Sequence, residues 1–124
     1  MAIRDIDHIT IATDKLAEMR AFFCDVLELK EGWRPGIAFA GAWLYLGDRA
    51  VVHLMETKEP RRPSRESALD HFAFAIDDYD GAAQRLDAAK IPYRVNQLGD
   101  GSIRQIFIGD FGGVNIELNY RAPG

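Results

Sequence analysis

Apolar and polar residues alternate in two short stretches of the chain that resemble each other. The first reads DHITIATD from Asp7 to Asp14, and the second reads DHFAFAID from Asp70 to Asp77. Alternation with a period of two residues is typical of a half-buried β-strand. A second correspondence, between WLYLGD at 43–48 and QIFIGD at 105–110, has nearly the same offset. We therefore interpret the chain as two copies of one unit, a pattern that organises the whole fold.

Each half reads as a strand, then an amphipathic helix, then two or three further strands. In the first half the pattern predicts strands over 3–12, 37–46 and 50–56, a helix over 14–28 and a tight turn at 47–49. In the second half it predicts strands over 71–76, 93–98, 103–108 and 114–120, and a helix capped by Asp77 or Asp78 and stopped by Pro92. Two such units predict an α+β fold, an open, cupped mixed β-sheet with the helices outside.

The length of 124 residues predicts one domain, residues 1–124. Its parts are module one at 3–57, a linker at 58–67 and module two at 68–121. The linker is polar, contains proline, and carries arginines that form either a solvated surface or a clamp for an anionic substrate.

Composition excludes several classes of function. The net charge is −4 and the pI is near 5.3, which argues against a nucleic-acid partner. No apolar stretch approaches the ~20 residues of a membrane span, and the N-terminus does not resemble a signal peptide. The single cysteine, Cys24, cannot form an internal disulfide and reads as a small core residue. A cytoplasmic protein without a membrane partner is expected.

The three histidines of the chain fall on strands that the repeat relates, as does Glu117. Alternation places His8, His53, His71 and Glu117 on strand faces whose other residues are mostly small or polar, which leaves room for a metal ion and a substrate. Three imidazoles and a carboxylate suit one divalent transition metal, namely Zn, Ni, Co, Mn or Fe(II). His53 has a second interpretation, as a residue that contacts the substrate or another ligand rather than the metal.

At these residues the chain resembles the vicinal oxygen chelate superfamily, which includes glyoxalase I, bleomycin-resistance proteins, fosfomycin-resistance proteins and extradiol dioxygenases. The resembling segments are DHITIA at 7–12, FFCDVL at 22–27, GAWLYLG at 41–47, DHFAF at 70–74 and GDFGGVNIEL at 109–118. The resemblance implies paired βαβββ modules, with metal ligands His8, His53, His71 and Glu117 on the first, fourth, fifth and eighth strands. Glyoxalase-like members usually have Glu or Gln where this chain has His53, so Glu117 alone is left as a carboxylate base.

The resulting hypothesis is an enzyme, a metal-dependent glyoxalase-like lyase or isomerase acting on a small substrate chelated through vicinal oxygens. Glu117 is the candidate catalytic base. The predicted substrate-binding residues are Thr10, Trp43, Tyr45, Gln105, Phe107, Asn115 and Asn119. A homodimer is expected, in which the modules pair either within a chain or between chains.

Other functions stay open. The same cup serves as a non-catalytic drug- or metabolite-sequestering protein in bleomycin-resistance relatives, which typically lack the metal ligands. A fosfomycin-type thiol transferase would need a tyrosine near Phe107 and a cationic tail past Glu117, and an extradiol dioxygenase would need a further histidine and tyrosine. A structural dimer with a vestigial site is a third class.

Overall fold

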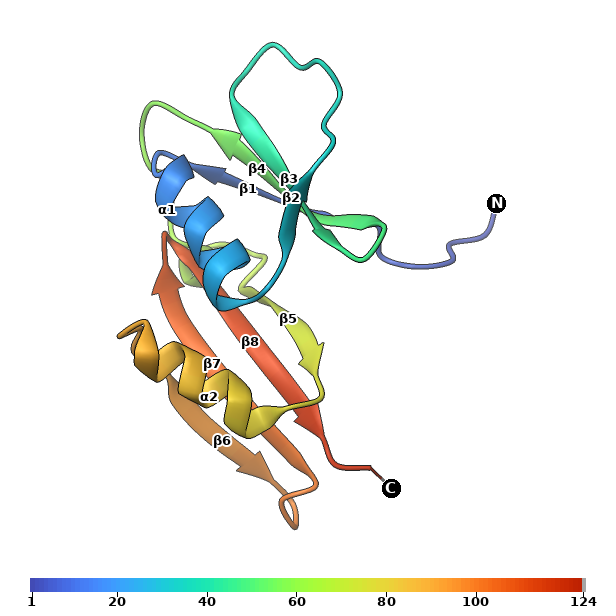
Figure 1. Ribbon diagram of the computed structural model, residues 1–124, viewed down its shortest axis with the longest axis vertical. Helices are drawn as coiled ribbons and strands as arrows, with labels where there is room; N and C mark the ends of the chain where they lie inside the picture. The colour runs from blue at the N-terminus through green and yellow to red at the C-terminus, as the bar shows by residue number, and fades with distance from the viewer. Residues whose placement is uncertain (124) are drawn as a thin grey trace. The chain divides into compact units, whose positions relative to one another are not determined.

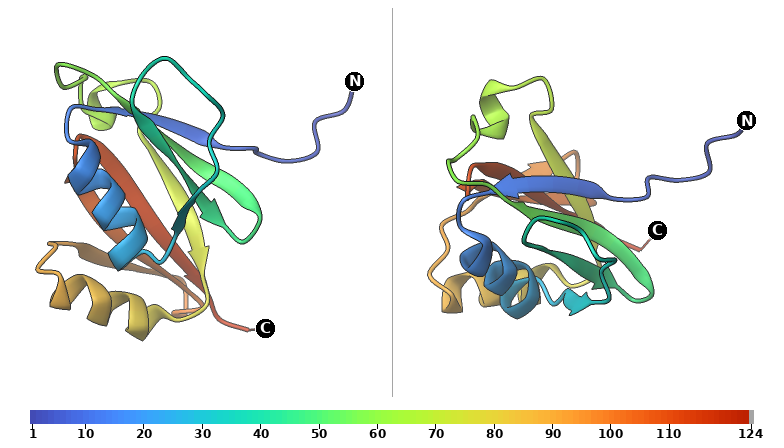
Figure 2. Two further views of the ribbon diagram at one scale, coloured as in Figure 1. Left: turned by 45° about the horizontal axis from the view of Figure 1, so that its top comes forward. Right: turned by 90° about the horizontal axis from the view of Figure 1, so that it is seen from above.

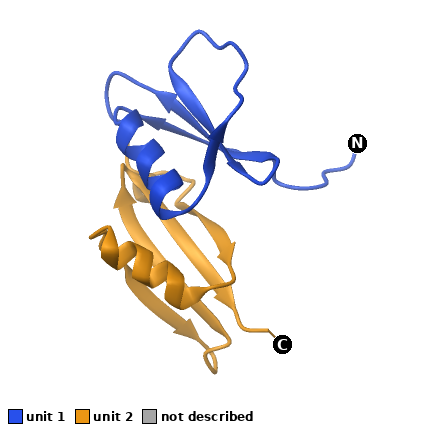
Figure 3. Cartoon of the chain, viewed as in Figure 1, with its two compact units in different colours: residues 1–61 blue, residues 62–124 orange. Residues whose placement is uncertain are grey.

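The structure, a computed structural model, describes residues 1–123. They form two compact units, residues 1–61 and the part of the chain from Arg62 onward, coloured separately in Figure 3. Each unit contains one four-stranded mixed sheet, with the strand order β1-β4-β3-β2 in the first and β5-β8-β7-β6 in the second. The two orders are the same when the strands are numbered within each unit. This confirms the α+β fold of repeated modules.

The first unit follows the predicted order of elements. It contains β1 (Ile9–Thr13), α1 (Leu16–Ala21), a π-helical turn η1 (Phe22–Val26), β2 (Lys30–Gly32), β3 (Gly41–Leu46) and β4 (Arg49–Glu56), as Figure 1 shows. β1 runs parallel to β4, while β3 runs antiparallel to both of its neighbours. The very short β2 was not predicted, because three residues are too few to show a period-two pattern.

The predicted first strand is longer than the observed one. β1 begins at Ile9, and Figure 1 shows the preceding residues running away from the sheet of this unit. Ile3 and Ile6 are largely exposed. Their spacing of three residues does not continue the period of two, and side-chain contacts from Arg49 to Asp5 and to the Ile6 carbonyl hold this segment instead.

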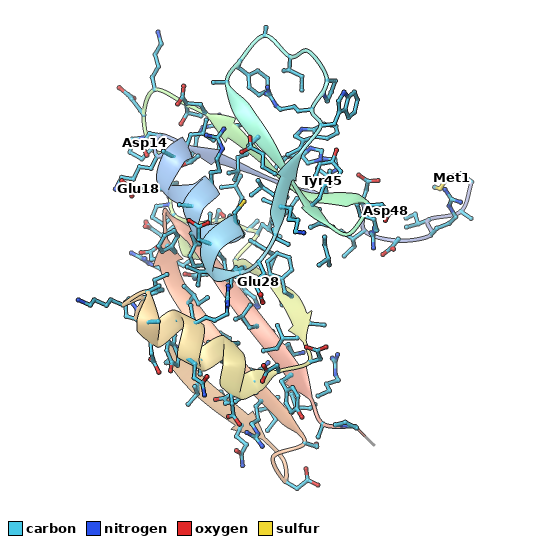
Figure 4. The ribbon with its side chains drawn as sticks, viewed as in Figure 1. Met1, Asp14, Glu18, Glu28, Tyr45 and Asp48 are labelled. Atoms are coloured by element: carbon cyan, nitrogen blue, oxygen red, sulfur yellow. The ribbon has the colours of Figure 1, made fainter. Side chains whose placement is uncertain are left out.

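The helical segment of the first unit is continuous but not uniform. Its α-helical part widens into a π-helical turn at Phe22, so that the adjacent Phe22 and Phe23 are both buried. Figure 4 shows Asp14 at the start of this segment and Glu28 beyond its end. Thr13 forms a local turn just before the helix, because its hydroxyl accepts a hydrogen bond from the Lys15 backbone N–H at 2.9 Å, while the N-cap residue Lys15 makes no side-chain capping hydrogen bond.

The second unit has longer and more regular elements. It contains η2 (Ser64–Glu66), β5 (His71–Ile76), α2 (Tyr79–Ala88), β6 (Arg94–Leu98), β7 (Ile103–Phe111) and β8 (Val114–Arg121). Figures 1 and 2 show α2 lying along one face of this sheet. Asp78 caps α2 by accepting a hydrogen bond from the backbone N–H of Gly81 at 3.0 Å, as one of the two predicted alternatives required.

The faces of the second sheet separate as the alternation predicted. Ile116 and Leu118 are buried, with Leu86 of α2 and Ile106 of β7 also fully buried in this unit. The strand pairing places the intervening residues on the other face, where Glu117 lies opposite Phe107 and Ala73. This second face carries the candidate functional residues. Within residues 1–123, no helix is long and apolar enough to cross a membrane.

Candidate metal centre

His8 stands directly before β1 and is held by the residue that precedes it. Its Nδ1 lies 2.7 Å from Oδ1 of Asp7. A carboxylate can only accept a hydrogen bond, so this contact requires the proton on Nδ1 of His8; in the neutral ring the free lone pair is then on Nε2. The hydrogen bond from His8 also holds the pKa of the Asp7 carboxyl below its ordinary value.

His53, on β4, lies between two aromatic rings. Its ring stacks on His8 with 3.7 Å between centroids and on Trp43 with 3.9 Å between centroids. The strand pairing explains the contact with Trp43, because Trp43 on β3 is directly opposite His53. His8 lies two residues before Thr10, the residue of β1 that is opposite His53. Nε2 of His53 lies 3.1 Å from the carbonyl oxygen of Ala50, to which it donates. Desolvation and the neighbouring His8 lower the pKa of His53, which favours the neutral imidazole.

His71, on β5, repeats the arrangement of His8 in the second unit. Its Nδ1 lies 2.7 Å from Oδ2 of Asp70, and its Nε2 is 3.9 Å from Oε1 of Glu117. Two ligand atoms that each lie about 2.1 Å from a zinc ion can be separated by at most about 4.2 Å. The imidazole and the carboxylate are therefore close enough to share one divalent ion.

Glu117, on β8, is the most enclosed of the four candidate ligands, at 8% exposed. Two side-chain hydrogen bonds in series connect Asn96 on β6 to Glu117 through Gln105 on β7. Nδ2 of Asn96 donates to Oε1 of Gln105 at 3.1 Å, and Nε2 of Gln105 donates to Oε1 of Glu117 at 3.2 Å. The amide of Gln105 thus orients the carboxylate and satisfies part of its hydrogen-bonding capacity in a largely desolvated place.

The predicted substrate-binding residues have different surroundings. Thr10 is exposed and lies beside His53, while Phe107 lies beneath the Arg94 guanidinium at 4.3 Å from the ring centroid. Asn119 lies opposite Gln105, and its Oδ1 is buried without a hydrogen-bond partner among the described residues.

Two of the predicted residues are engaged in local structure. The hydroxyl of Tyr45 donates to the Trp33 carbonyl at 2.6 Å, and Figure 4 shows Tyr45 beside the crossing of β2 and β3. Oδ1 of Asn115 accepts the Asp110 backbone N–H at 2.7 Å, which fixes the turn between β7 and β8. Both side chains therefore have a structural role irrespective of any substrate.

The donor set fits a divalent transition metal, although the ligands meet in pairs. His8 lies with His53 in the first unit, and His71 lies with Glu117 in the second. Within residues 1–123, no three His, Cys, Asp or Glu side chains gather closely enough to form a complete metal site. Neutral imidazoles with free nitrogen lone pairs and one carboxylate are the ligands that Zn, Fe(II) and related ions accept.

Sequence reasoning missed several residues of these surfaces. Asp7 and Asp70 served as markers of the repeat, yet their contacts with the histidines give them a role of their own. Trp33 is 71% exposed and makes an edge-to-face contact with Trp43, and no periodic pattern could have linked the two. Asn96 lies on a predicted strand, where the alternation alone could have placed it on the face of Gln105.

Residues 5–118 match the sequence profile of the Glyoxalase/Bleomycin resistance protein/Dioxygenase superfamily. The chain belongs to this superfamily. Its members include enzymes, and they typically bind a divalent metal ion. The match confirms the resemblance to the vicinal oxygen chelate proteins that the repeated segments indicate.

Individual relatives support the same membership. The chain is 26% identical to the uncharacterized protein YaeR of Escherichia coli (strain K12) over 132 aligned positions, covering 95% of this chain and 97% of that protein. The fosfomycin resistance protein FosX of Listeria monocytogenes superposes with a TM-score of 0.76 at 20% identity, covering 96% of this chain and 94% of FosX. The lactoylglutathione lyase of Agrobacterium tumefaciens superposes with a TM-score of 0.70 at 22% identity, covering 97% and 96%. At these identities the two structures show a common fold.

Proposed function

We propose that the protein is a metal-dependent glyoxalase-like lyase or isomerase that acts on a small substrate chelated through two vicinal oxygens. In this proposal His8, His71 and Glu117 hold one divalent transition metal ion, and His53 is the fourth candidate ligand. The observation that carries the proposal is the approach of His71 Nε2 to Glu117 Oε1 at 3.9 Å on neighbouring parallel strands. The bound ion would supply Lewis-acid stabilisation of negative charge on the substrate oxygens.

Glu117 is the proposed base. It is the one carboxylate among the candidate ligands, and it is largely enclosed. Gln105 donates to one of its oxygens, which holds the carboxylate in place while its remaining lone pairs can accept a proton from the substrate carbon next to a carbonyl group. A positioned base of this kind contributes about 10²–10⁴-fold to the rate.

Asn119 is a second point of support for a polar substrate. Its Oδ1 is buried without a partner among the residues described, on the strand face that also presents Glu117. A buried acceptor without a donor is unfavourable by about 1–3 kcal/mol. A substrate hydroxyl would satisfy this oxygen, and we assign Asn119 to substrate orientation.

The first experiment is the metal content of protein purified without a nickel column, measured by elemental analysis beside His71→Ala and Glu117→Gln. About one divalent ion per chain, lost or strongly reduced in both variants, is the expected result. Activity is then assayed with 2-oxoaldehyde hemithioacetals, epoxide antibiotics and catechols. Failure of the wild-type protein to bind Zn, Ni, Co, Mn or Fe(II) after addition of each would overturn the metal-dependent function.

The homodimer is proposed as well, and light scattering of the same preparations tests it by measuring the molar mass.

A second candidate function is sequestration of a flat ligand without chemistry. It is favoured by the aromatic column of Trp43, His53 and His8, next to which the exposed Trp33 lies edge-on to Trp43. Such rings bind planar apolar groups by stacking. Quenching of tryptophan fluorescence by a drug that carries a planar aromatic group, such as the bithiazole of bleomycin, would favour this candidate if it is equally strong with and without added metal and occurs without turnover.

A further inference from the structure

His8, which precedes β1, and His71, which begins β5, share one contact. His53, the third histidine of the chain, does not have it. In each unit an aspartate stands immediately before the histidine, and its carboxylate bonds Nδ1 of the ring at 2.7 Å. The contact occurs at equivalent positions of the repeat, at Asp7–His8 and at Asp70–His71. Neighbouring residues can make this contact by chance once, but its recurrence with the same ring nitrogen indicates a shared purpose.

We propose that Asp7 and Asp70 are positioning residues that fix the proton of His8 and His71 on Nδ1, and so present Nε2 of each ring as the metal-binding atom. This inference rests on the proposed function, because it assigns these nitrogens to the metal ion of that site. The proposal applies to the protein before any metal is bound. In it, the chain rather than the metal ion determines which ring nitrogen of each histidine carries the proton.

The chemistry of the contact determines which nitrogen is protonated. An ionised carboxylate has acceptor oxygens and no donor, so a hydrogen bond to it requires the ring N–H. In a neutral imidazole the other nitrogen then has the free lone pair that a metal ion needs. In His71 this second nitrogen is the one that lies 3.9 Å from Oε1 of Glu117. The His71 ring thus lies between two carboxylates, with Nδ1 facing Asp70 and Nε2 facing Glu117.

His53 shows the opposite case within the same protein. Val52 precedes it, and its Nε2 donates to the carbonyl oxygen of Ala50 at 3.1 Å. A carbonyl oxygen, like a carboxylate, accepts only, so the proton of His53 belongs on Nε2 and the free lone pair on Nδ1. The structure therefore assigns one tautomer to His8 and His71 and the other to His53.

The two aspartates are suited to this role because they contribute little to the core. The side chain of Asp7 is 93% exposed and that of Asp70 is 61% exposed. A carboxylate that accepts the second N–H of a metal-bound histidine orients the ring and raises its basicity, and loss of such a partner typically lowers metal affinity about 10–100-fold. Replacement of either aspartate should therefore leave the fold intact while it changes the histidine.

The test begins with the metal-free protein, because the tautomers can be observed without a ligand. Long-range ¹⁵N–¹H correlation spectra of the three histidines at neutral pH should show Nδ1–H for His8 and His71 and Nε2–H for His53. Asp7→Ala should abolish the preference of His8 alone, and Asp70→Ala that of His71 alone. Asp14→Ala and Asp77→Ala are the matched controls, since these aspartates close the same repeated segments and have no side-chain partner among residues 1–123.

Zn²⁺ affinity, measured by competition with a chromophoric chelator, is the second readout. Asp7→Ala and Asp70→Ala should each lower affinity by about 10–100-fold, and the two controls by less than about 3-fold. Asp7→Asn and Asp70→Asn, whose amide oxygen still accepts a hydrogen bond, should keep the tautomer and recover part of the affinity.

The two readouts separate the possible failures. Unchanged tautomers in Asp7→Ala and Asp70→Ala would overturn this inference and leave the proposed metal function standing. Lost tautomer preference with unchanged Zn²⁺ affinity would show that the ring protons have no bearing on metal binding, and would also overturn it. Absence of metal binding by the wild-type protein would overturn the proposed function and, with it, the ligand role given to the two Nε2 atoms.

Discussion

The side-chain amide of Gln105 donates a hydrogen bond to the carboxylate of Glu117, with 3.2 Å between Nε2 and Oε1. The two residues are diagonal neighbours on antiparallel strands, because Gln105 pairs with Asn119 and Glu117 pairs with Phe107. Glu117 is 8% exposed, so water can replace this donor only in part. The contact links the orientation of the candidate base to a residue on the adjacent strand.

Replacing Gln105 with leucine should therefore lower stability mainly because Glu117 loses its hydrogen-bond donor. A hydrogen bond to a charged group contributes about 1.5–3 kcal/mol, and we expect Gln105→Leu to lower the free energy of unfolding at pH 7 by an amount in this range. In a Glu117→Gln background, where residue 117 has no charge, the same change should lower the free energy of unfolding by less than about 1 kcal/mol. Urea denaturation of the four proteins of this cycle measures the difference, and equal costs in both backgrounds would contradict the assigned contact.

His53 should contribute less to metal binding than His71. Its Nε2 is already bonded to the Ala50 carbonyl, and its ring is enclosed between His8 and Trp43. We expect His53→Phe, which keeps an aromatic ring in the column, to lower Zn²⁺ affinity less than His71→Ala does. Chelator competition measures both values, and near-UV circular dichroism checks that the column persists. A larger loss in His53→Phe would make His53 a principal ligand through Nδ1.

The architecture was accessible from the sequence because alternation and repetition are local signals. The stretch from Asp70 to Asp77 predicted β5 with its bounds, and Asp78 was one of two predicted caps for α2. The metal-ligand candidates followed from the same repeat. Two parts of the first unit were not predicted correctly. The predicted first strand began at Ile3, whereas β1 begins at Ile9, and β2 at Lys30–Gly32 is too short for a period to be recognised.

The contacts within the candidate site were less accessible, because they depend on side-chain directions across strands. Alternation could place Gln105 and Glu117 on one face, but not establish which atom of each meets the other. The stacking of His53 between two rings requires the register of β3, β4 and β1 together. The ring nitrogen that each histidine uses is likewise a property of the folded chain.

Asp100 should make the β6–β7 turn sensitive to acid. Its Oδ1 accepts the backbone N–H of Ser102 at 3.0 Å, and this hydrogen bond holds the pKa of the carboxyl below its ordinary value of 3.8. Because the folded pKa is the lower one, the stabilisation is present above the ordinary pKa and is lost as the pH falls through the lowered value. Titration of the Asp100 carboxyl by NMR should give a pKa below that of the same residue in a short peptide. Asp100→Asn should remove the accompanying shift of the Ser102 amide, and an unperturbed midpoint in the folded protein would contradict the contact.

Gly41 is required for the close approach of β3 to β4. A Cβ atom at this position would overlap the carbonyl oxygen of Leu54 and would lie 2.9 Å from Nη2 of Arg34. Backbone cannot move aside as a flexible side chain can, so we expect Gly41→Ala to lower the free energy of unfolding by about 1–3 kcal/mol, the usual range for overpacking. Gly36→Ala is the matched control, because a Cβ there meets nothing within 4 Å and the backbone does not have a positive φ.

Of the two glycine variants, only Gly41→Ala should therefore lower stability. Gly36→Ala should be neutral or stabilising by up to about 1 kcal/mol, since alanine restricts the unfolded chain without straining the folded one. Urea denaturation with a shared slope for the three proteins gives both values. Gly41 pairs with Met55, two positions along β3 from the Trp43–His53 pair, so strain at Gly41 should also alter the aromatic column. Reduced stability of Gly41→Ala with an unchanged Trp43 fluorescence spectrum would confine the strain to the strand end, and unchanged stability would show that β3 and β4 can separate there at little cost.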